Sequence, residues 1–181
     1  MDKLFPIVPV VSVSGKEQPI PVEFLTDEQT PQIKTDEFFG YQLKINRLEH
    51  FEMLLQDPIS IEMPINKKKV SLRMPSPERF VVHKIVTHSL RQNPVKKQKD
   101  AYYAYYVLRF HPEPETLLKN IRELKLGEKT KIVRQSLKDS FDSLTAPGIL
   151  HVEKEMGLQG IDENLRQDVF ERFAALRQIF A

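Results

Sequence analysis

The stretch MPSPERFVVHKIVTHSLRQNPVKKQKDAYYAYYVLRF, residues 74–110, decides the fold. Ser76 followed by Pro77 and Glu78 is typical of a helix N-terminus, because proline suits the first helical position and an acid there faces the positive end of the helix dipole. The Asn93-Pro94 pair ends this helix near residue 91 and starts a second helix, which should end near residue 110. Because the connection is short, we expect the two helices to pack antiparallel.

Cations crowd this stretch and the residues just before it. Residues 67–99 contain ten lysines and arginines and one acid, Glu78, whereas the rest of the chain holds the other 17 of its 27 cations and 24 of its 25 acids. Such a patch attracts phosphates by long-range Coulomb force, which salt weakens. A solvated basic face is the plainer interpretation, and it stays open.

The first helix divides into an apolar and a polar side. Val82, Ile85 and Val86 share the face that we expect to be buried. The opposite side predicts a short polar ridge of four side chains: Lys84, Thr87, His88 and Arg91. The second helix begins with further charged residues: Lys96, Lys97, Lys99 and Asp100. A phosphate could lie between such groups, lysine acting as a point charge and arginine as a fork. Alternatively, Lys84 extends to water and Asp100 pairs with a neighbouring lysine.

Four tyrosines follow at once in the second helix. At about 100° per residue, Tyr102, Tyr103 and Tyr106 cover one sector, and Tyr105 falls at its edge. Aromatic rings beside cations can stack on nucleic acid bases. Such rings more often form a helix-packing face, so we expect this sector to pack against the core.

The remaining sequence predicts strands before this stretch and helices after it. Residues 4–13 and 20–25 suggest a hairpin, residues 26–40 a polar loop, and residues 59–63 and 70–74 two more strands. The last helix carries an apolar stripe: Leu165, Val169, Phe173, Leu176 and Phe180. We therefore expect an α+β fold, in which a small mixed β-sheet in residues 1–75 is followed by a helical bundle in residues 76–181.

Composition limits the class of protein. With 40% hydrophobic residues the 181-residue chain can bury a core, and its lack of cysteine excludes disulfides and thiolate metal sites. Its first apolar run is interrupted by prolines and is too short for a signal peptide or a membrane span. We expect a cytoplasmic protein with no membrane partner. The five histidines include no pair at zinc-ligand spacing with a partnering acid, so we expect no zinc site.

Two segments carry a resemblance to a known family. MPSPERFVVHKIVTHSLR (residues 74–91) and KKQKDAYYAYYVL (residues 96–108) resemble helical motifs of the nucleotidyltransferase-like superfamily. They are most similar to a bacterial branch with Pro-x-Pro-x-Arg-Phe-x-x-His-Lys followed by Lys-x-x-Lys-Asp, which is related to abortive-infection toxins. PIPVEFLTD (residues 19–27) resembles the family strand that supplies a third metal-binding carboxylate. The resemblance covers about residues 5–125.

The resemblance implies a set of site residues. Lys84 and Asp100 carry the motif positions that face the nucleotide. Supporting positions for nucleotide or phosphate are Arg79, His83, Arg91, Lys96 and Lys99. Glu23 takes the place of the third carboxylate and is the expected metal ligand, although it is one methylene longer than the family's aspartate. Mg²⁺ is the implied cofactor if the chain is active, and a nucleoside triphosphate or a nucleic acid is the implied partner.

One departure from the family pattern is large. None of the six glycines is followed by Ser or Gly, and the sequence has no Asp-x-Asp or Asp-x-Glu. By the resemblance, the family uses a Gly-Ser or Gly-Gly turn to hold the triphosphate and an Asp-x-Asp or Asp-x-Glu pair to bind Mg²⁺. We therefore expect a truncated or degenerate nucleotidyltransferase that is inactive alone. Three forms stay open: a second polypeptide or upstream segment completes the site, residues 67–99 bind nucleic acid or protein without catalysis, or the C-terminal stripe dimerises.

Overall fold

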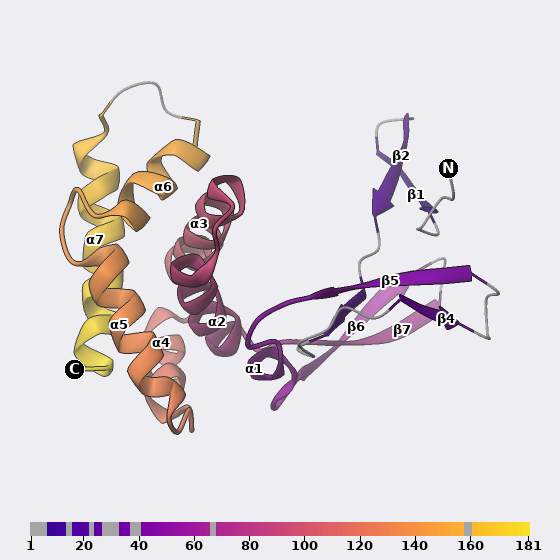
Figure 1. Ribbon diagram of the computed structural model, residues 1–181, viewed down its shortest axis with the longest axis horizontal. Helices are drawn as coiled ribbons and strands as arrows, with labels where there is room; N and C mark the ends of the chain where they lie inside the picture. Colours follow the sequence, from indigo (N-terminus) through magenta and orange to yellow (C-terminus); the bar gives the residue numbers. More distant parts are fainter. Residues whose placement is uncertain are drawn as a thin grey trace. The chain divides into compact units, whose positions relative to one another are not determined.

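The computed structural model (Figure 1) describes residues 7–13, 16–21, 24–26, 33–36, 41–65, 68–157 and 161–181. The chain divides into two compact units, Met1–Glu52 and Met53–Ala181. The predicted division at residue 75/76 falls between the last strand and the first long helix, and it stays a prediction.

The described part of the first unit consists mainly of strands. β1 (Ile7–Val13) pairs antiparallel with β2 (Lys16–Pro21), which confirms a hairpin here, although its second strand begins earlier than the predicted residues 20–25. A mixed three-stranded sheet has the order β3-β5-β4, in which β3 (Phe24–Thr26) is parallel and β4 (Ile33–Asp36) antiparallel to β5 (Tyr41–Arg47). The loop predicted for residues 26–40 is thus wrong over β4, whose four residues are too few to show a period. Glu23 lies outside the described residues.

The second unit begins at the short helix α1 (Glu52–Leu55) and contains a hairpin and a helical bundle. β6 (Ile59–Ile65) pairs antiparallel with β7 (Lys68–Met74), so both strands predicted here are confirmed. The helices that follow have these bounds: α2 (Pro77–Leu90), α3 (Pro94–Phe110), α4 (Pro114–Glu123), α5 (Lys129–Phe141), α6 (Pro147–Glu155) and α7 (Glu163–Ile179). The fold is α+β, with strands followed by helices.

Proline and polar caps set the helix boundaries. Four helices start at a proline, at residues 77, 94, 114 and 147, where the missing N–H costs no intrahelical hydrogen bond. The Asn93 side chain accepts a hydrogen bond from the Lys96 N–H at 3.1 Å, and Asp162 accepts one from the Leu165 N–H at 2.9 Å. Ser76 occupies the predicted N-cap position of α2, but its side chain makes no capping bond.

Helix α2 packs against three helices, α3, α4 and α5. Val82, Ile85 and Val86 are buried as predicted. Thr87 and His88 are buried as well, so the predicted polar ridge is wrong at both positions. With neighbours on three sides, α2 leaves few positions for a polar face, and Lys84 is one of those that still reach the surface.

The C-terminal apolar stripe is part of the core. Its five residues, Leu165, Val169, Phe173, Leu176 and Phe180, are all buried. The Phe173 ring stacks on Phe141 of α5, with ring centroids 3.7 Å apart. This stripe therefore packs into the core of the bundle.

Of the helices in the described ranges, none combines the length and the apolar character that crossing a membrane requires.

Candidate functional site

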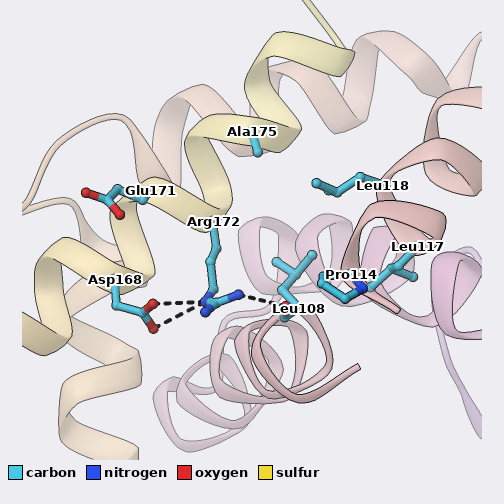
Figure 2. Close-up of a pocket in the computed structure, with 8 residues that line it drawn as sticks. All are labelled: Leu108, Pro114, Leu117, Leu118, Asp168, Glu171, Arg172 and Ala175. Atoms are coloured by element: carbon cyan, nitrogen blue, oxygen red, sulfur yellow. Dashed lines mark hydrogen bonds and ion pairs between the residues drawn. The ribbon is translucent and has the colours of Figure 1, made fainter. Parts of the chain in front are cut away.

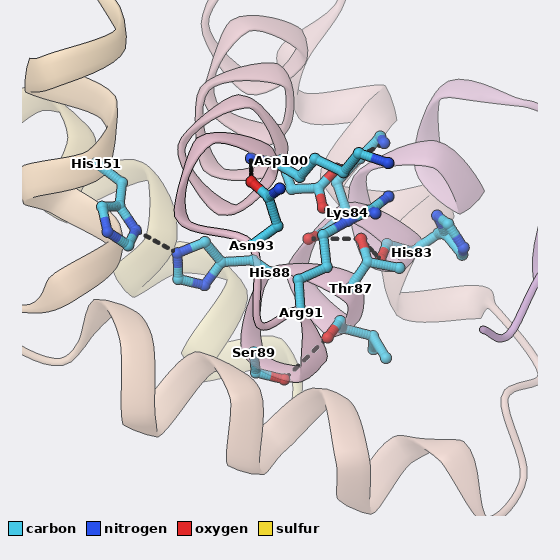
Figure 3. Close-up of polar contacts among 11 residues, drawn as sticks. His83, Lys84, Thr87, His88, Ser89, Arg91, Asn93, Asp100 and His151 are labelled. Carbon is cyan, nitrogen blue, oxygen red and sulfur yellow. Dashed lines mark hydrogen bonds and ion pairs between the residues drawn. The ribbon is translucent and has the colours of Figure 1, made fainter. Parts of the chain in front are cut away.

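Three predicted site residues meet on the α2–α3 pair (Figure 3). Lys84 Nζ donates a hydrogen bond to Asp100 Oδ1 at 2.7 Å, and Arg91 Nε donates to Asp100 Oδ2. The side chain of Asp100 is only 3% exposed, whereas Lys84 is 14% and Arg91 24% exposed. We call these three residues the Asp100 cluster.

The local sequence explains this meeting. Lys84 lies on α2, and Arg91 is the C-cap residue that follows this helix, in extended backbone where the chain turns toward α3. The connection of residues 91–93 folds α3 back along α2, because Asn93 caps the new helix directly. Asp100 then lies in the second turn of α3, within reach of both cations. The expected antiparallel packing is confirmed by these contacts.

The electrostatics of the Asp100 cluster favour an anionic ligand. One carboxylate neutralises one of two cations, which leaves a formal charge of +1. A buried carboxylate is expensive unless it is paired and hydrogen bonded, and both of its oxygens are bonded here. The two cations are therefore held in fixed positions, with part of each side chain open to solvent.

Aromatic rings adjoin the exposed part of Lys84. Its Nζ atom lies 5.4 Å from the centre of the Phe80 ring and 5.7 Å from the centre of the Tyr103 ring. Both distances suit cation–π attraction. The packing predicted for the tyrosines is wrong in detail: Tyr105 is the fully buried ring, whereas Tyr103 is 41% and Tyr106 49% exposed.

The other predicted site residues lie apart from the Asp100 cluster. Arg79 is buried and donates to Gln56 Oε1 at 2.8 Å and to Asp57 Oδ2 at 2.6 Å, so it fixes the start of α2 to the segment after α1. His83 is buried within the bundle. The predicted phosphate ligands Lys96 and Lys99 are exposed in the first two turns of α3.

A second polar cluster was not predicted from the sequence. The buried His88 ring has its Nδ1 atom 3.1 Å from Ser140 Oγ of α5. Its Nε2 atom lies 2.9 Å from His151 Nδ1 of α6, and Figure 3 shows this contact. Burial, the adjacent His151 and the charge of Lys97 lower the pKa of His88 to about 3. These partners are 52 and 63 residues away in sequence, so no local pattern indicates them.

A third network lies at a small pocket between α3, α4 and α7 (Figure 2), which has a volume of about 270 Å³. Asp168 accepts hydrogen bonds from Tyr105 at 2.6 Å and from Arg109 at 2.5 Å, and Arg172 also bonds to it. Burial raises the pKa of Tyr105 to about 12. The Arg172 guanidinium also donates to the Leu108 carbonyl, so this network joins α3 to α7.

The described residues contain no preformed cluster of metal ligands. Among them, no group of three or more acids and histidines is placed to hold a metal. Asp100 is the one acid of the Asp100 cluster, and both of its oxygens accept bonds from cations. Magnesium requires oxygen ligands that are open to it, and the Asp100 cluster offers none.

Comparison with known proteins places this α+β chain in a class. A family model described as Nucleotidyltransferase matches residues 8–122. Because the match covers more than half of the chain, the protein belongs to this nucleotidyltransferase family. The match ends in α4, so α5, α6 and α7 lie beyond it. No curated protein and no solved structure matches the chain.

Proposed function

We propose that the Asp100 cluster binds the phosphates of a nucleotide. One observation supports this proposal most: two cations, Lys84 of α2 and Arg91 at its C-cap, converge on a single buried carboxylate while keeping part of their side chains open to solvent. Arg91 offers a planar fork for phosphate oxygens, and Lys84 offers a point charge. Asp100 acts as a positioning residue, because it holds both cations before the ligand arrives.

On its own, the chain is proposed to bind a nucleotide without catalysing nucleotidyl transfer. The acidic pair that binds Mg²⁺ in this superfamily, according to the resemblance, is not among the 181 residues. A complete transferase site would need carboxylates from outside this sequence, and a second polypeptide is the source that we propose. The relation of this chain to abortive-infection toxins stays a prediction. Adding the purified protein alone to labelled ATP and RNA should give no nucleotidyl transfer.

Titration calorimetry with MgATP tests the phosphate site. An Arg91→Ala variant should bind MgATP about 10-fold more weakly or worse, because a hydrogen bond to a charged group contributes roughly 1.5–3 kcal/mol. Lys96→Ala is the matched control, since Lys96 is exposed on the same helix pair but lies outside the Asp100 cluster. Equal affinities of the Arg91 variant and the parent protein would remove the proposal.

Removing Lys84 alone would leave a buried charge with fewer partners, and the variant could fail to fold. A double variant, Lys84→Met with Asp100→Leu, replaces this pair by apolar groups of similar size, and only the partly exposed Arg91 then loses its countercharge. We expect this variant to unfold cooperatively at a lower temperature than the parent protein and to lose MgATP affinity. A folded double variant that binds as tightly as the parent protein would contradict the phosphate role of Lys84.

The alternative function, nucleic-acid binding by residues 67–99, is tested by the same titration with a short RNA at two salt concentrations. Each phosphate contact to single-stranded nucleic acid contributes about −0.7 to the slope of log affinity against log salt. The exposed Lys96 and Lys99 would contribute to such a surface, whereas Arg79 is buried and bonded. RNA binding that Lys96→Ala weakens more than Arg91→Ala would favour this alternative.

A further inference from the structure

An apolar groove opens beside the Asp100 cluster. It has a volume of about 480 Å³, within the range of small-molecule sites. Its walls come from α1, α2, α3 and the segments that flank β7 and α3: Leu54, Met74, Pro75, Pro77, Phe80, Tyr106, Val107, Phe110, His111 and Pro112. Apolar and aromatic groups dominate this lining, so the groove suits a flat apolar ligand.

Aromatic rings contact one another along α3, and two of them, Tyr106 and Phe110, line the groove. Tyr102 lies against both Tyr103 and Tyr106, with centroids 5.9 Å apart in each pair, and Tyr106 lies 4.8 Å from Phe110. Tyr106 is 49% and Phe110 59% exposed. Large rings in a core helix are normally covered, so core packing does not explain the exposure of Tyr106 and Phe110.

The groove and the Asp100 cluster share Phe80 as a neighbour. Phe80 lines the groove, and its ring centre lies 5.4 Å from Lys84 Nζ. Tyr103, which also lies beside Lys84, is one turn from Tyr106 in the groove wall. From Asp100 toward the end of α3, the surface therefore changes from cationic to aromatic within about three turns.

This order matches one class of ligand. A nucleotide has anionic phosphates at one end and a flat aromatic base at the other, joined by a sugar. An apolar peptide or the apolar face of a second copy would match the groove but not the cations beside it. Charge complementarity therefore favours the nucleotide as the occupant.

We propose that the groove is the base site of the nucleotide whose phosphates bind Lys84 and Arg91, an inference that rests on the proposed function. The base lies against Tyr106 and Phe110, and Phe80 separates it from the phosphate site. Because the lining offers few polar groups, recognition comes from stacking, which every base can make. The four ribonucleoside triphosphates should therefore bind within about 10-fold of one another.

Titrations of the whole chain with ATP and with inorganic tripolyphosphate, both without added Mg²⁺, separate the two sites. Tripolyphosphate carries the phosphates without the base, so ATP should bind about 10-fold more tightly or better if the base is held. Tyr106→Ala and Phe110→Ala should each weaken ATP roughly 5- to 150-fold, the range of base–aromatic stacking, and leave tripolyphosphate unchanged. Leu144→Ala, an exposed apolar residue outside the groove, is the control.

Each outcome decides between the proposals. Equal affinities for ATP and tripolyphosphate, with no effect of the ring variants, would overturn the base site and leave the phosphate site standing. Loss of ATP binding in the ring variants but not in Arg91→Ala would support the base site and contradict the phosphate site. Absence of binding by either probe would overturn both. A dimer seen by light scattering that the ring variants dissociate, with ATP affinity unchanged, would assign the groove to a second copy.

Discussion

Asp100 is the residue on which the α2–α3 pair depends most. It is almost fully buried, and its two oxygens bond to Lys84 and Arg91. Asp100→Asn would leave two partly buried cations without a countercharge, so we expect the free energy of unfolding to fall by about 3–4 kcal/mol. Urea denaturation measures this change.

The exposed Asp142→Asn is the control for this prediction, and its stability should stay within about 0.5 kcal/mol of the parent protein. If Asp100→Asn were as stable as the control, the Asp100 cluster would contribute little to packing, and the fixed positions of its cations would need another explanation.

His88 makes stability depend on pH. The groups that face it from neighbouring elements are Ser140, His151, Lys97 and Asp100. Its pKa is about 3 in the folded protein, below the ordinary value of 6.5, so the unfolded chain binds more protons between these values. The contribution of His88 to the free energy of unfolding is therefore complete above about pH 6.5, and it is lost as the pH falls toward 3.

Urea denaturation from about pH 7.5 to about pH 4 tests this dependence. His88 should contribute a slope of at most about 1.4 kcal/mol per pH unit, and His88→Gln should flatten the profile of the parent protein. His111→Gln serves as the control, because the His111 ring bonds only to the backbone of Glu113 in the described structure. Parallel profiles for the parent protein and His88→Gln would show that the prediction is wrong.

At the residue scale, the sequence predicted those site residues that helical spacing or a family motif indicates. Lys84 and Asp100 came from the resemblance, and Arg91 from its two-turn separation on the same helix. The partners of Arg79 and His88 could not be found in this way, since they lie 22 to 63 residues away and depend on how helices pack. Glu23 lies outside the described residues, so its role stays a prediction.

At the element scale, the approach of α5 and α6 depends on Gly148. A Cβ atom there would lie 2.3 Å from Phe141 Cε1 and 2.6 Å from the Ser140 carbonyl oxygen. Gly148→Ala should therefore push the helices apart and lower the unfolding free energy by about 3 kcal/mol. Thermal denaturation should show this loss for Gly148→Ala and not for the exposed Thr145→Ala on the same connection; equal midpoints would contradict it.

Helix boundaries were more predictable than strands. The start of α2 and both ends of α3 were predicted to the residue, because proline and the Asn93 cap act locally. β5 was missed although Tyr41, Leu43 and Ile45 alternate with polar residues, and β4 is too short to show alternation. The burial of Thr87 and His88 was not predicted, because α2 contacts three helices and the polar pattern of its own sequence does not show this.

At the scale of the whole molecule, the last helix completes the core. Phe173 is fully buried and stacks on Phe141. Phe173→Ala should lower the unfolding free energy by about 3–5 kcal/mol, with the unfolding midpoint independent of protein concentration. A midpoint that rises with concentration in the parent protein would instead indicate that this stripe contributes to a dimer.

The α+β class follows from sequence, because strand and helix periods separate cleanly near residue 75. Family membership agrees with the resemblance, since the match over residues 8–122 includes the strands and the helix pair that suggested it. How α5, α6 and α7 complete the bundle was not predictable, because amphipathic helices can pack in several arrangements.

The affinity for inorganic tripolyphosphate tests the central claim most directly, since this probe has no base and reports on the cations alone. We predict that the parent protein and Lys96→Ala bind it equally, and that Arg91→Ala binds about 10-fold more weakly or worse. Equal affinity of all three proteins, with Arg91→Ala shown to be folded by its thermal transition, would contradict a phosphate site at the Asp100 cluster.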